Sequence, residues 1–132
     1  MSSHVPLRRL KELARAMWRR SYAPYSRYRV GAALETESGA VFTGCNVENA
    51  SYGLTICAER GALAAAVAQG HRSFRRLVVA TEGDQAVAPC GACRQVLAEF
   101  GTRLEVHGIG TKENRRWTLQ ELIPEVFVLT DD

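Results

Sequence analysis

Two short cysteine segments constrain this chain more than any other feature. One reads Cys-Ala-Glu-Arg at residues 57–60, and the other reads Pro-Cys-Gly-Ala-Cys at residues 89–93. Each lies where the sequence predicts the start of a helix. Three sulfur ligands, an open fourth position and a nearby carboxylate are what a catalytic zinc needs in order to activate water. We therefore predict a zinc site with one ion per chain, held by Cys57, Cys90 and Cys93.

Glu59 and Arg60 complete this predicted constellation. Three thiolates and Zn²⁺ sum to a negative charge, which works against ionising a bound water. At about 5 Å and an effective dielectric of about 20, the charge of Arg60 is worth roughly 3 kcal/mol against that effect. Glu59 is predicted to take a proton from the water and give it to the substrate.

Two other uses of the cysteines stay open at this point. The C-x-x-C spacing of residues 90–93 also occurs in thioredoxin-like redox pairs, and Cys45 would make a fourth ligand for a structural zinc. We interpret Cys45 as a small buried side chain at the end of an apolar strand. The three histidines have no ligand spacing and are predicted to be non-catalytic.

Length and composition bound the class of protein. A chain of 132 residues is expected to form one domain over residues 1–132, and 46% apolar with 23% charged residues is ordinary for a soluble protein. The net charge of +3 comes from scattered basic residues, which does not favour a nucleic-acid partner. No apolar window is long enough to span a membrane, and no apolar segment follows the first basic residues, so we expect a cytoplasmic protein.

Hydrophobic periodicity predicts the elements of an α/β fold. It indicates helices at residues 5–22, 57–70, 91–100 and 119–123, and strands at residues 29–36, 40–46, 76–81, 104–109 and 115–118. Pro24 is expected to end the first helix, Gly70 and Gly101 to stop the next two, and Thr118 to cap the last. The polar run at 46–55 is predicted to be a loop. We expect a three-layer α/β/α arrangement around a mixed sheet of about five strands.

Several motifs in this order resemble a known family. They are Pro-Tyr-Ser-Arg-Tyr at 24–28 with Val-Gly-Ala-Ala at 30–33, Asn-Val-Glu-Asn-Ala-Ser-Tyr-Gly at 46–53, the segment at 57–60, Pro-Cys-Gly-Ala-Cys-Arg-Gln at 89–95, and Leu-Ile-Pro at 122–124 followed by Phe127. Together they cover nearly the whole chain, and the chain resembles the small, homotetrameric, zinc-dependent cytidine deaminases. The zinc motif is shared by many deaminases, whereas the Asn-x-Glu-Asn loop narrows the resemblance to those that act on free nucleosides.

The resemblance implies a substrate site. Asn46 and Glu48 would bind the ribose hydroxyls, since an amide and a carboxylate can donate to and accept from a sugar hydroxyl. Tyr28 stands where the family commonly has Phe, and it would stack on the pyrimidine ring. The backbone near Ala58 would recognise the amino group of the base.

The resemblance also assigns supporting and shared residues. Arg60 would hydrogen-bond the ligand sulfurs, and Gln95 is a secondary candidate near the metal helix. Tyr52 and Phe127 would complete the pocket of a neighbouring subunit in the tetramer.

The implied reaction is hydrolytic deamination of cytidine and deoxycytidine to uridine and deoxyuridine plus ammonia, in pyrimidine salvage. Water activated at the metal would attack C4 of the cytosine ring, and Glu59 would protonate N3 and then the leaving amine. Three rivals remain: a deaminase of a nucleoside antibiotic of the blasticidin S type, a polynucleotide deaminase, and a non-enzymatic zinc-stabilised binding module in which Glu59 is only an acid favoured by a helix N-terminus.

Overall fold

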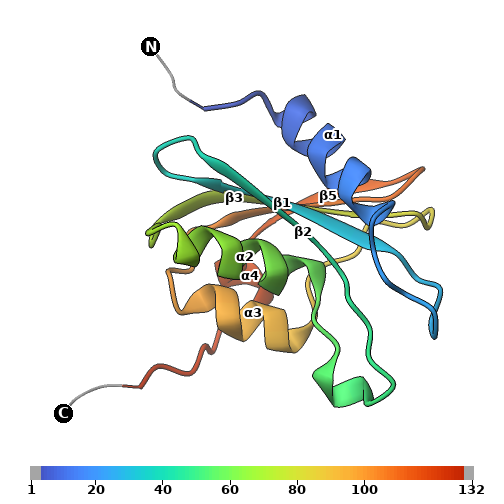
Figure 1. Ribbon diagram of the computed structural model, residues 1–132. Helices are drawn as coiled ribbons and strands as arrows, with labels where there is room; N and C mark the ends of the chain where they lie inside the picture. Colours follow the sequence, from blue (N-terminus) through green and yellow to red (C-terminus); the bar gives the residue numbers. More distant parts are fainter. Residues whose placement is uncertain (1–3, 130–132) are drawn as a thin grey trace.

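A mixed five-stranded sheet with helices on both faces forms the body of the molecule (Figure 1). The computed structural model describes residues 4–129. In the sheet, the strands lie in the order β2-β1-β3-β4-β5, and only β3 and β4 pair in parallel. The predicted α/β architecture is confirmed. The elements are α1 (Leu7–Trp18), β1 (Val30–Thr36), β2 (Val41–Cys45), the 3₁₀ turn η1 (Tyr52–Leu54), α2 (Ala58–Ala68), β3 (Phe74–Thr81), α3 (Gly91–Ala98), β4 (Glu105–Ile109), β5 (Asn114–Thr118) and α4 (Leu119–Leu122).

The central strand β3 shows how the three layers form. Its side chains alternate between faces, as in any strand. Leu77 and Val79 pack in a core with residues of α2, α3 and α4, whereas Val78 and Ala80 pack in a second core beneath α1. All four side chains are buried. The almost wholly apolar sequence of this strand therefore predicted its coverage on both faces correctly.

The first helix is shorter than the sequence predicted. It begins after Pro6 and ends at Trp18, so Pro24 is not its stop. Tyr22 instead pairs with the strand-like segment beyond β2: its N–H donates to Asn46 O at 3.0 Å, and its carbonyl accepts from Glu48 N–H at 2.8 Å. These two bonds require extended backbone at Tyr22, and the helix has to end before it.

Helix α2 lies directly on β2, and this contact fixes where its first turn sits. Gly44 of β2 is so close that a Cβ atom there would lie 2.3 Å from Ala58 O and 2.6 Å from Ala62 N. At the other end, Gly70 has φ +93°, a left-handed value that suits a glycine after a helix, and it stops α2 as predicted. Cys57 is the residue that precedes the helix.

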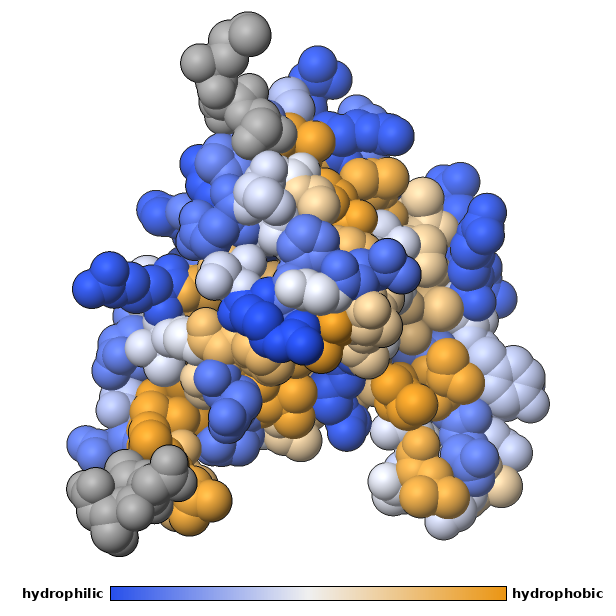
Figure 2. Space-filling view, turned by 60° about the vertical axis from the view of Figure 1, so that its left-hand side comes forward, coloured by the Kyte–Doolittle hydropathy of each residue, from blue (hydrophilic) through white to orange (hydrophobic). Residues whose placement is uncertain are grey.

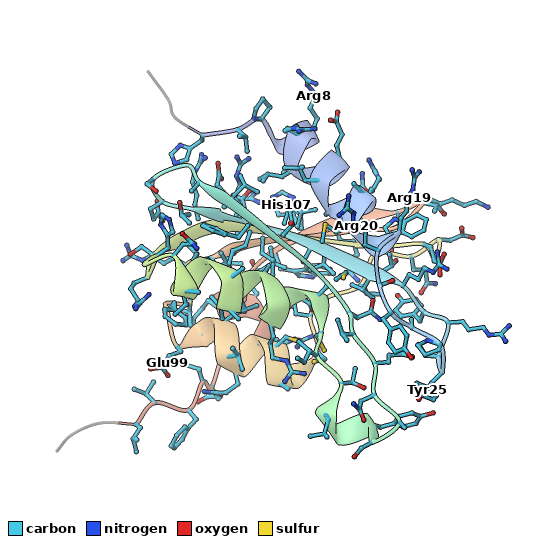
Figure 3. The ribbon with its side chains drawn as sticks, in the orientation of Figure 1. Arg8, Arg19, Arg20, Tyr25, Glu99 and His107 are labelled. Carbon is cyan, nitrogen blue, oxygen red and sulfur yellow. The ribbon has the colours of Figure 1, made fainter. Side chains whose placement is uncertain are left out.

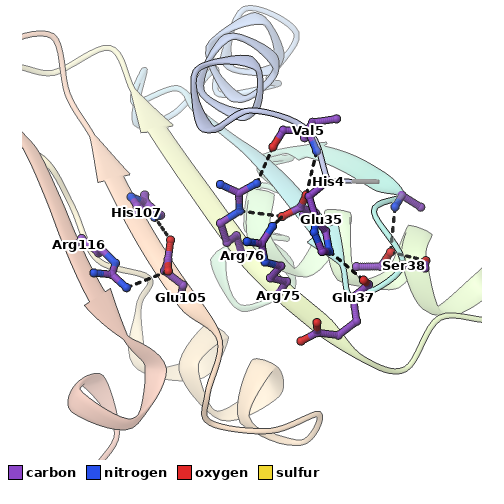
Figure 4. A network of polar contacts seen from close by, with 12 residues as sticks. His4, Val5, Glu35, Glu37, Ser38, Arg75, Arg76, Glu105, His107 and Arg116 are labelled. Atoms are coloured by element: carbon purple, nitrogen blue, oxygen red, sulfur yellow. Dashed lines mark hydrogen bonds and ion pairs between the residues drawn. The ribbon is translucent and has the colours of Figure 1, made fainter. Parts of the chain in front are cut away.

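A buried ion pair attaches the N-terminal segment to the sheet (Figure 4). Glu35 of β1 is fully buried, and it accepts from Arg76 Nε of β3 at 2.7 Å. Arg76 also donates to Val5 O at 2.6 Å, while Val5 N–H donates to Glu35 at 3.2 Å. Residues before α1 are thus held in extended form by paired charges, which is why α1 also begins later than predicted.

The remaining elements lie close to their predicted positions. Thr118 caps α4 with a capping box: its hydroxyl accepts from Glu121 N–H, and the Glu121 side chain accepts from Thr118 N–H. The predicted loop at 46–55 contains η1 and closes through a bridge between Val47 and Ile56. Within residues 4–129, no helix has the length and apolar character needed to cross a membrane.

Candidate active site

Three cysteines converge at the starts of two helices. Cys57 precedes α2, Cys90 precedes α3, and Cys93 lies in the first turn of α3. Their sulfur atoms all lie within 4.8 Å of one another, and the Sγ atoms of Cys57 and Cys90 are 3.9 Å apart. A tetrahedral zinc with Zn–S bonds of about 2.3 Å places its sulfurs about 3.8 Å apart. The donor set and its spacing therefore fit zinc.

No fourth cysteine, histidine or carboxylate joins this group among residues 4–129. Cys45, offered by sequence as a fourth ligand of a structural zinc, lies outside the cluster at the end of β2. It is also partly exposed rather than buried, so the prediction of a buried side chain was wrong. All four cysteines are free thiols. A three-sulfur group leaves one position of a tetrahedral metal for a water or substrate.

Contacts within the cluster favour the ionised form of Cys57. A hydrogen bond from the Cys93 thiol, followed by those of Arg60 and Cys90, lowers the pKa of Cys57 to about 5. The same contact with Cys57 raises the pKa of Cys93, so the pair holds one proton on Cys93. Arg60 Nη2 donates to Cys57 Sγ at 3.5 Å and to Thr55 O at 3.4 Å, while its buried Nε has no partner. The guanidinium thus keeps one further buried donor.

Glu59 lies beside the cysteines in the first turn of α2. It is 5% exposed, although a carboxylate at a helix N-terminus would ordinarily face solvent. Burial, reinforced by the charge of Cys57, raises the pKa of Glu59 to about 7. A carboxyl with such a pKa can both accept and donate a proton near neutral pH, as a general acid and base must do.

A cavity of about 330 Å³ opens over this group. Its size is that of sites for small ligands. The structure brings most of the predicted site residues to its wall: Tyr28, Asn46, Glu48, Cys57, Ala58, Glu59 and Cys90. Its lining includes the sulfur and carboxyl groups at the helix starts and the loops around residues 26–28 and 46–48.

On the side of the cavity predicted to bind the sugar, polar side chains hold the backbone in place. The amide of Asn46 accepts from Val30 N–H at 2.9 Å and donates to Tyr28 O at 2.8 Å. The carboxylate of Glu48 accepts from Tyr25 N–H at 3.0 Å and from Ser26 N–H at 3.1 Å. Both side chains therefore support the segment before β1 while they line the cavity.

Besides Cys93 and Arg60 of the sulfur group, three predicted residues lie outside this wall. Tyr52 is 73% exposed and packs edge-on against Tyr25 with ring centroids 6.0 Å apart. Phe127 is 69% exposed near the C-terminal end of the described chain. Gln95 of α3 donates to Phe127 O at 3.3 Å and does not line the cavity. The pair joins two loops, since Tyr25 lies between α1 and β1 and Tyr52 lies in η1; Figure 3 shows Tyr25 near the tip of the first loop.

Exposed apolar side chains gather around these outlying residues. Figure 2 shows apolar groups in two projections at the bottom of the molecule. Large exposed apolar residues in the loop after β2 and in the C-terminal segment include Val47, Tyr52, Leu54, Ile56, Phe127, Val128 and Leu129. Such surface area is characteristic of interaction sites.

Sequence reasoning missed part of the wall. Ser26, Thr55, Val79, Val87 and Ala88 also line the cavity. Ser26 lies inside a quoted motif, and its hydroxyl could have been suspected of contacting a loop carboxylate. Val79 gave no signal, because an apolar residue of a central strand is expected to serve the core alone.

Comparisons with known proteins agree with this site. The family model for the cytidine and deoxycytidylate deaminase zinc-binding region matches residues 6–108. A cytidine deaminase of Sporosarcina psychrophila is 53% identical over 113 residues, covering 84% of this chain and 83% of the relative. A probable cytidine deaminase of Dictyostelium discoideum is 46% identical over 112 residues, covering 84% of this chain and 76% of the relative.

A solved structure extends the agreement to the fold. The crystal structure of cytidine deaminase from Burkholderia pseudomallei superposes with a TM-score of 0.89 at 47% identity, covering 93% of this chain and 100% of that one. The family suggested by the sequence motifs is confirmed, and with it a hydrolytic deaminase rather than a redox protein. This chain belongs to the cytidine and deoxycytidylate deaminase family.

Proposed function

We propose that this single-domain chain is a cytoplasmic enzyme that hydrolyses cytidine and deoxycytidine to uridine and deoxyuridine plus ammonia, in pyrimidine salvage. One zinc per chain would be bound by Cys57, Cys90 and Cys93. The observation that carries the proposal is the buried carboxyl of Glu59 beside three converging thiols, at one wall of a cavity of about 330 Å³. Zinc, when bound, supplies the Lewis acidity that makes water nucleophilic at neutral pH.

Glu59 moves the protons of the reaction. Hydrolysis of an aminopyrimidine requires a proton to leave the attacking water, a proton to reach ring N3, and a proton to reach the departing amine. With a pKa of about 7, Glu59 can accept the first of these and return it to the substrate. Its burial also argues against the binding-module alternative, because an acid that served only the helix dipole would remain in water.

Arg60 and the helix starts balance charge at the sulfurs. Three thiolates outweigh the charge of a divalent ion, and Arg60 donates to Cys57 Sγ at 3.5 Å with its Nε still free to donate. N-terminal helix dipoles at α2 and α3 act in the same direction. The backbone at Ala58, in the first turn of α2, would contact the amino group of the base.

The opposite wall would hold the nucleoside. The ring of Tyr28 would stack on the pyrimidine, in line with its place on the cavity wall. Asn46 keeps a second N–H and Glu48 keeps a lone pair after their contacts within the chain, and these would bind the ribose hydroxyls. Loop walls with fixed polar groups orient a substrate and lower the entropic part of the barrier.

A homotetramer would complete the site. Tyr52 and Phe127 are largely exposed and lie off the cavity of their own chain, which supports a role in the pocket of a neighbouring copy. The apolar surface around them would be covered in such an assembly. Gln95 would then act indirectly, by holding the backbone of Phe127 in place.

An ultraviolet assay tests the proposal. Loss of the aminopyrimidine absorbance should follow mixing of the protein with cytidine or deoxycytidine. Blasticidin S and a cytosine-bearing oligonucleotide serve as the competing substrates. Unchanged cytidine and deoxycytidine alongside turnover of a competitor would refute the proposed substrate, and no turnover of any of the four by zinc-loaded protein would refute the proposed activity.

A further inference from the structure

The carboxylate of Glu48 is held by the turn that precedes β1. Oε1 accepts from the N–H groups of Tyr25 and Ser26, and Oε2 accepts from the Ser26 hydroxyl in a short contact. An ionised carboxylate offers about four lone-pair sites. Three are in use, and the one that remains is on Oε2, the oxygen that Ser26 contacts. A sugar hydroxyl that binds Glu48 therefore shares that oxygen with Ser26.

The direction of this hydrogen bond is fixed by its neighbours. Tyr28 N–H donates to Ser26 Oγ at 3.0 Å. A backbone N–H can only donate and an ionised carboxylate can only accept, so the Ser26 oxygen accepts from Tyr28 and its single hydrogen points to Glu48. Bonds in such a chain polarise and strengthen one another. The Ser26 hydroxyl is thus oriented before any substrate arrives.

The residue between Ser26 and Tyr28 adopts a sparsely populated conformation. Arg27 has φ 60°, the only positive φ of a non-glycine residue among the described residues. Such a conformation persists where surrounding contacts hold it. Here the contacts are Arg27 N–H to Ala23 O at 3.0 Å and the bonds from Ser26 to Glu48.

We propose that Ser26 is a positioning residue for the reaction: its hydroxyl fixes the free oxygen of Glu48 so that the site selects nucleosides that carry the sugar hydroxyl bound there. This inference rests on the proposed function, because it concerns the sugar side of the same cavity. It assigns to Ser26, acting through Glu48, a part in substrate specificity.

Loss of the Ser26 hydroxyl should loosen the side chain of Glu48 more than the backbone of Tyr28. The backbone of Tyr28 keeps a second support, since Asn46 donates to its carbonyl at 2.8 Å. Glu48 keeps only the two N–H donors on Oε1, and Oε2 becomes free to rotate toward solvent. The Ser26 hydroxyl is also the largest cause that lowers the pKa of Glu48, which supports a strong contact.

The test compares Ser26→Ala with the parent on cytidine and on 2′,3′-dideoxycytidine. We expect the KM for cytidine to rise roughly 10-fold, with kcat within about 3-fold, because a hydrogen bond to a charged group is weakened. On the dideoxy nucleoside the two proteins should have equal kcat/KM within about 2-fold. Ser26→Thr, which keeps a hydroxyl, should restore the parental KM. Ser73→Ala, at an exposed serine just before β3, should match the parent.

Additivity separates positioning from a general loss of structure. The double variant Ser26→Ala with Glu48→Gln should have the same KM as Glu48→Gln alone, within about 2-fold. If Ser26 acts only through Glu48, its substitution has no further effect once Glu48 is replaced. An equal loss on the dideoxy nucleoside, or full additivity, would overturn the proposal while leaving the deaminase activity intact.

A measurement without substrate covers the case in which cytidine is not turned over at all. A carbon-detected nuclear magnetic resonance titration should show a higher pKa for Glu48 in Ser26→Ala than in the parent. An unchanged Glu48 pKa would overturn the proposed contact, whereas an inactive parent with the expected shift would refute only the proposed function.

Discussion

The two walls of the cavity are built in different ways. On the metal wall, each functional group sits at a helix start, and the helices are fixed by apolar packing: Ala58, Ala62 and Leu97 belong to the main core. On the sugar wall, Glu48 and Ser26 belong to loops that are held by one another's hydrogen bonds. Under the proposed function, the chemistry that needs rigid sulfur geometry would use the core, and recognition of the substrate would use loops on the surface.

This contrast predicts that damage to the metal wall abolishes activity, whereas damage to the sugar wall weakens binding. The largest effect is expected for Cys93→Ala. Cys93 is fully buried, so its loss should reduce zinc from about one per chain to almost none and leave no measurable turnover. Metal analysis of the purified protein checks this.

Cys45→Ala is the matched control, because Cys45 lies outside the sulfur group. It should keep its zinc and its activity. Full zinc in Cys93→Ala would show that the metal is bound elsewhere.

Glu59→Gln should give the next largest effect. The substitution keeps the shape of the side chain and removes the proton carrier, so kcat should fall by roughly 10²- to 10⁴-fold with zinc retained. Single-turnover assays on protein of known zinc content would measure the fall. A variant that deaminates cytidine at the parental rate would assign proton transfer to another group.

The sequence predicted the metal wall better than the sugar wall, for physical reasons. The cysteines and Glu59 are placed by local features, a helix start and the spacing along it, which can be read from neighbouring residues. The contacts of Asn46 with Tyr28 and Val30, and of Glu48 with Ser26, join segments about twenty residues apart. Short-range patterns do not contain such pairings, and the early end of α1 at Trp18 was missed for the same reason, since Tyr22 pairs with the distant loop.

Glu48→Gln tests the sugar wall itself. The carboxylate accepts from three donors, whereas glutamine has only one acceptor oxygen. The substitution should therefore weaken both the hydrogen bonds to the turn and the binding of the sugar hydroxyl. We expect the KM for cytidine to rise roughly 10- to 100-fold with a smaller change in kcat, because substrate and transition state lose the same contact. Steady-state kinetics would contradict the assignment if kcat alone fell.

Gly44→Ala tests how firmly the metal wall is tied to the core. The added Cβ would lie 2.3 Å from Ala58 O, so α2 must shift or the strand must bend. Overpacking of this kind costs roughly 1–3 kcal/mol in the free energy of unfolding. Urea denaturation measures the loss. Gly53→Ala is the control, since nothing lies within 4 Å of its Cβ position, and equal stability of the two variants would refute the tight contact.

The smallest expected effect is a pH dependence confined to the sugar wall. The Ser26 hydroxyl, above all, holds the pKa of Glu48 below its ordinary value of 4.5. A carboxylate with a depressed pKa contributes fully above the ordinary pKa, and its contribution is lost as the pH falls through the lowered value. The factor by which Glu48→Gln raises the KM for cytidine should therefore stay level from about pH 8 to about pH 5 and shrink only in stronger acid. Protonation of the substrate ring affects parent and Glu48→Gln alike, so the ratio of their KM values isolates the carboxylate. If the KM of Glu48→Gln divided by the KM of the parent already falls between about pH 7 and about pH 5, Glu48 lacks the stabilising contacts of the turn.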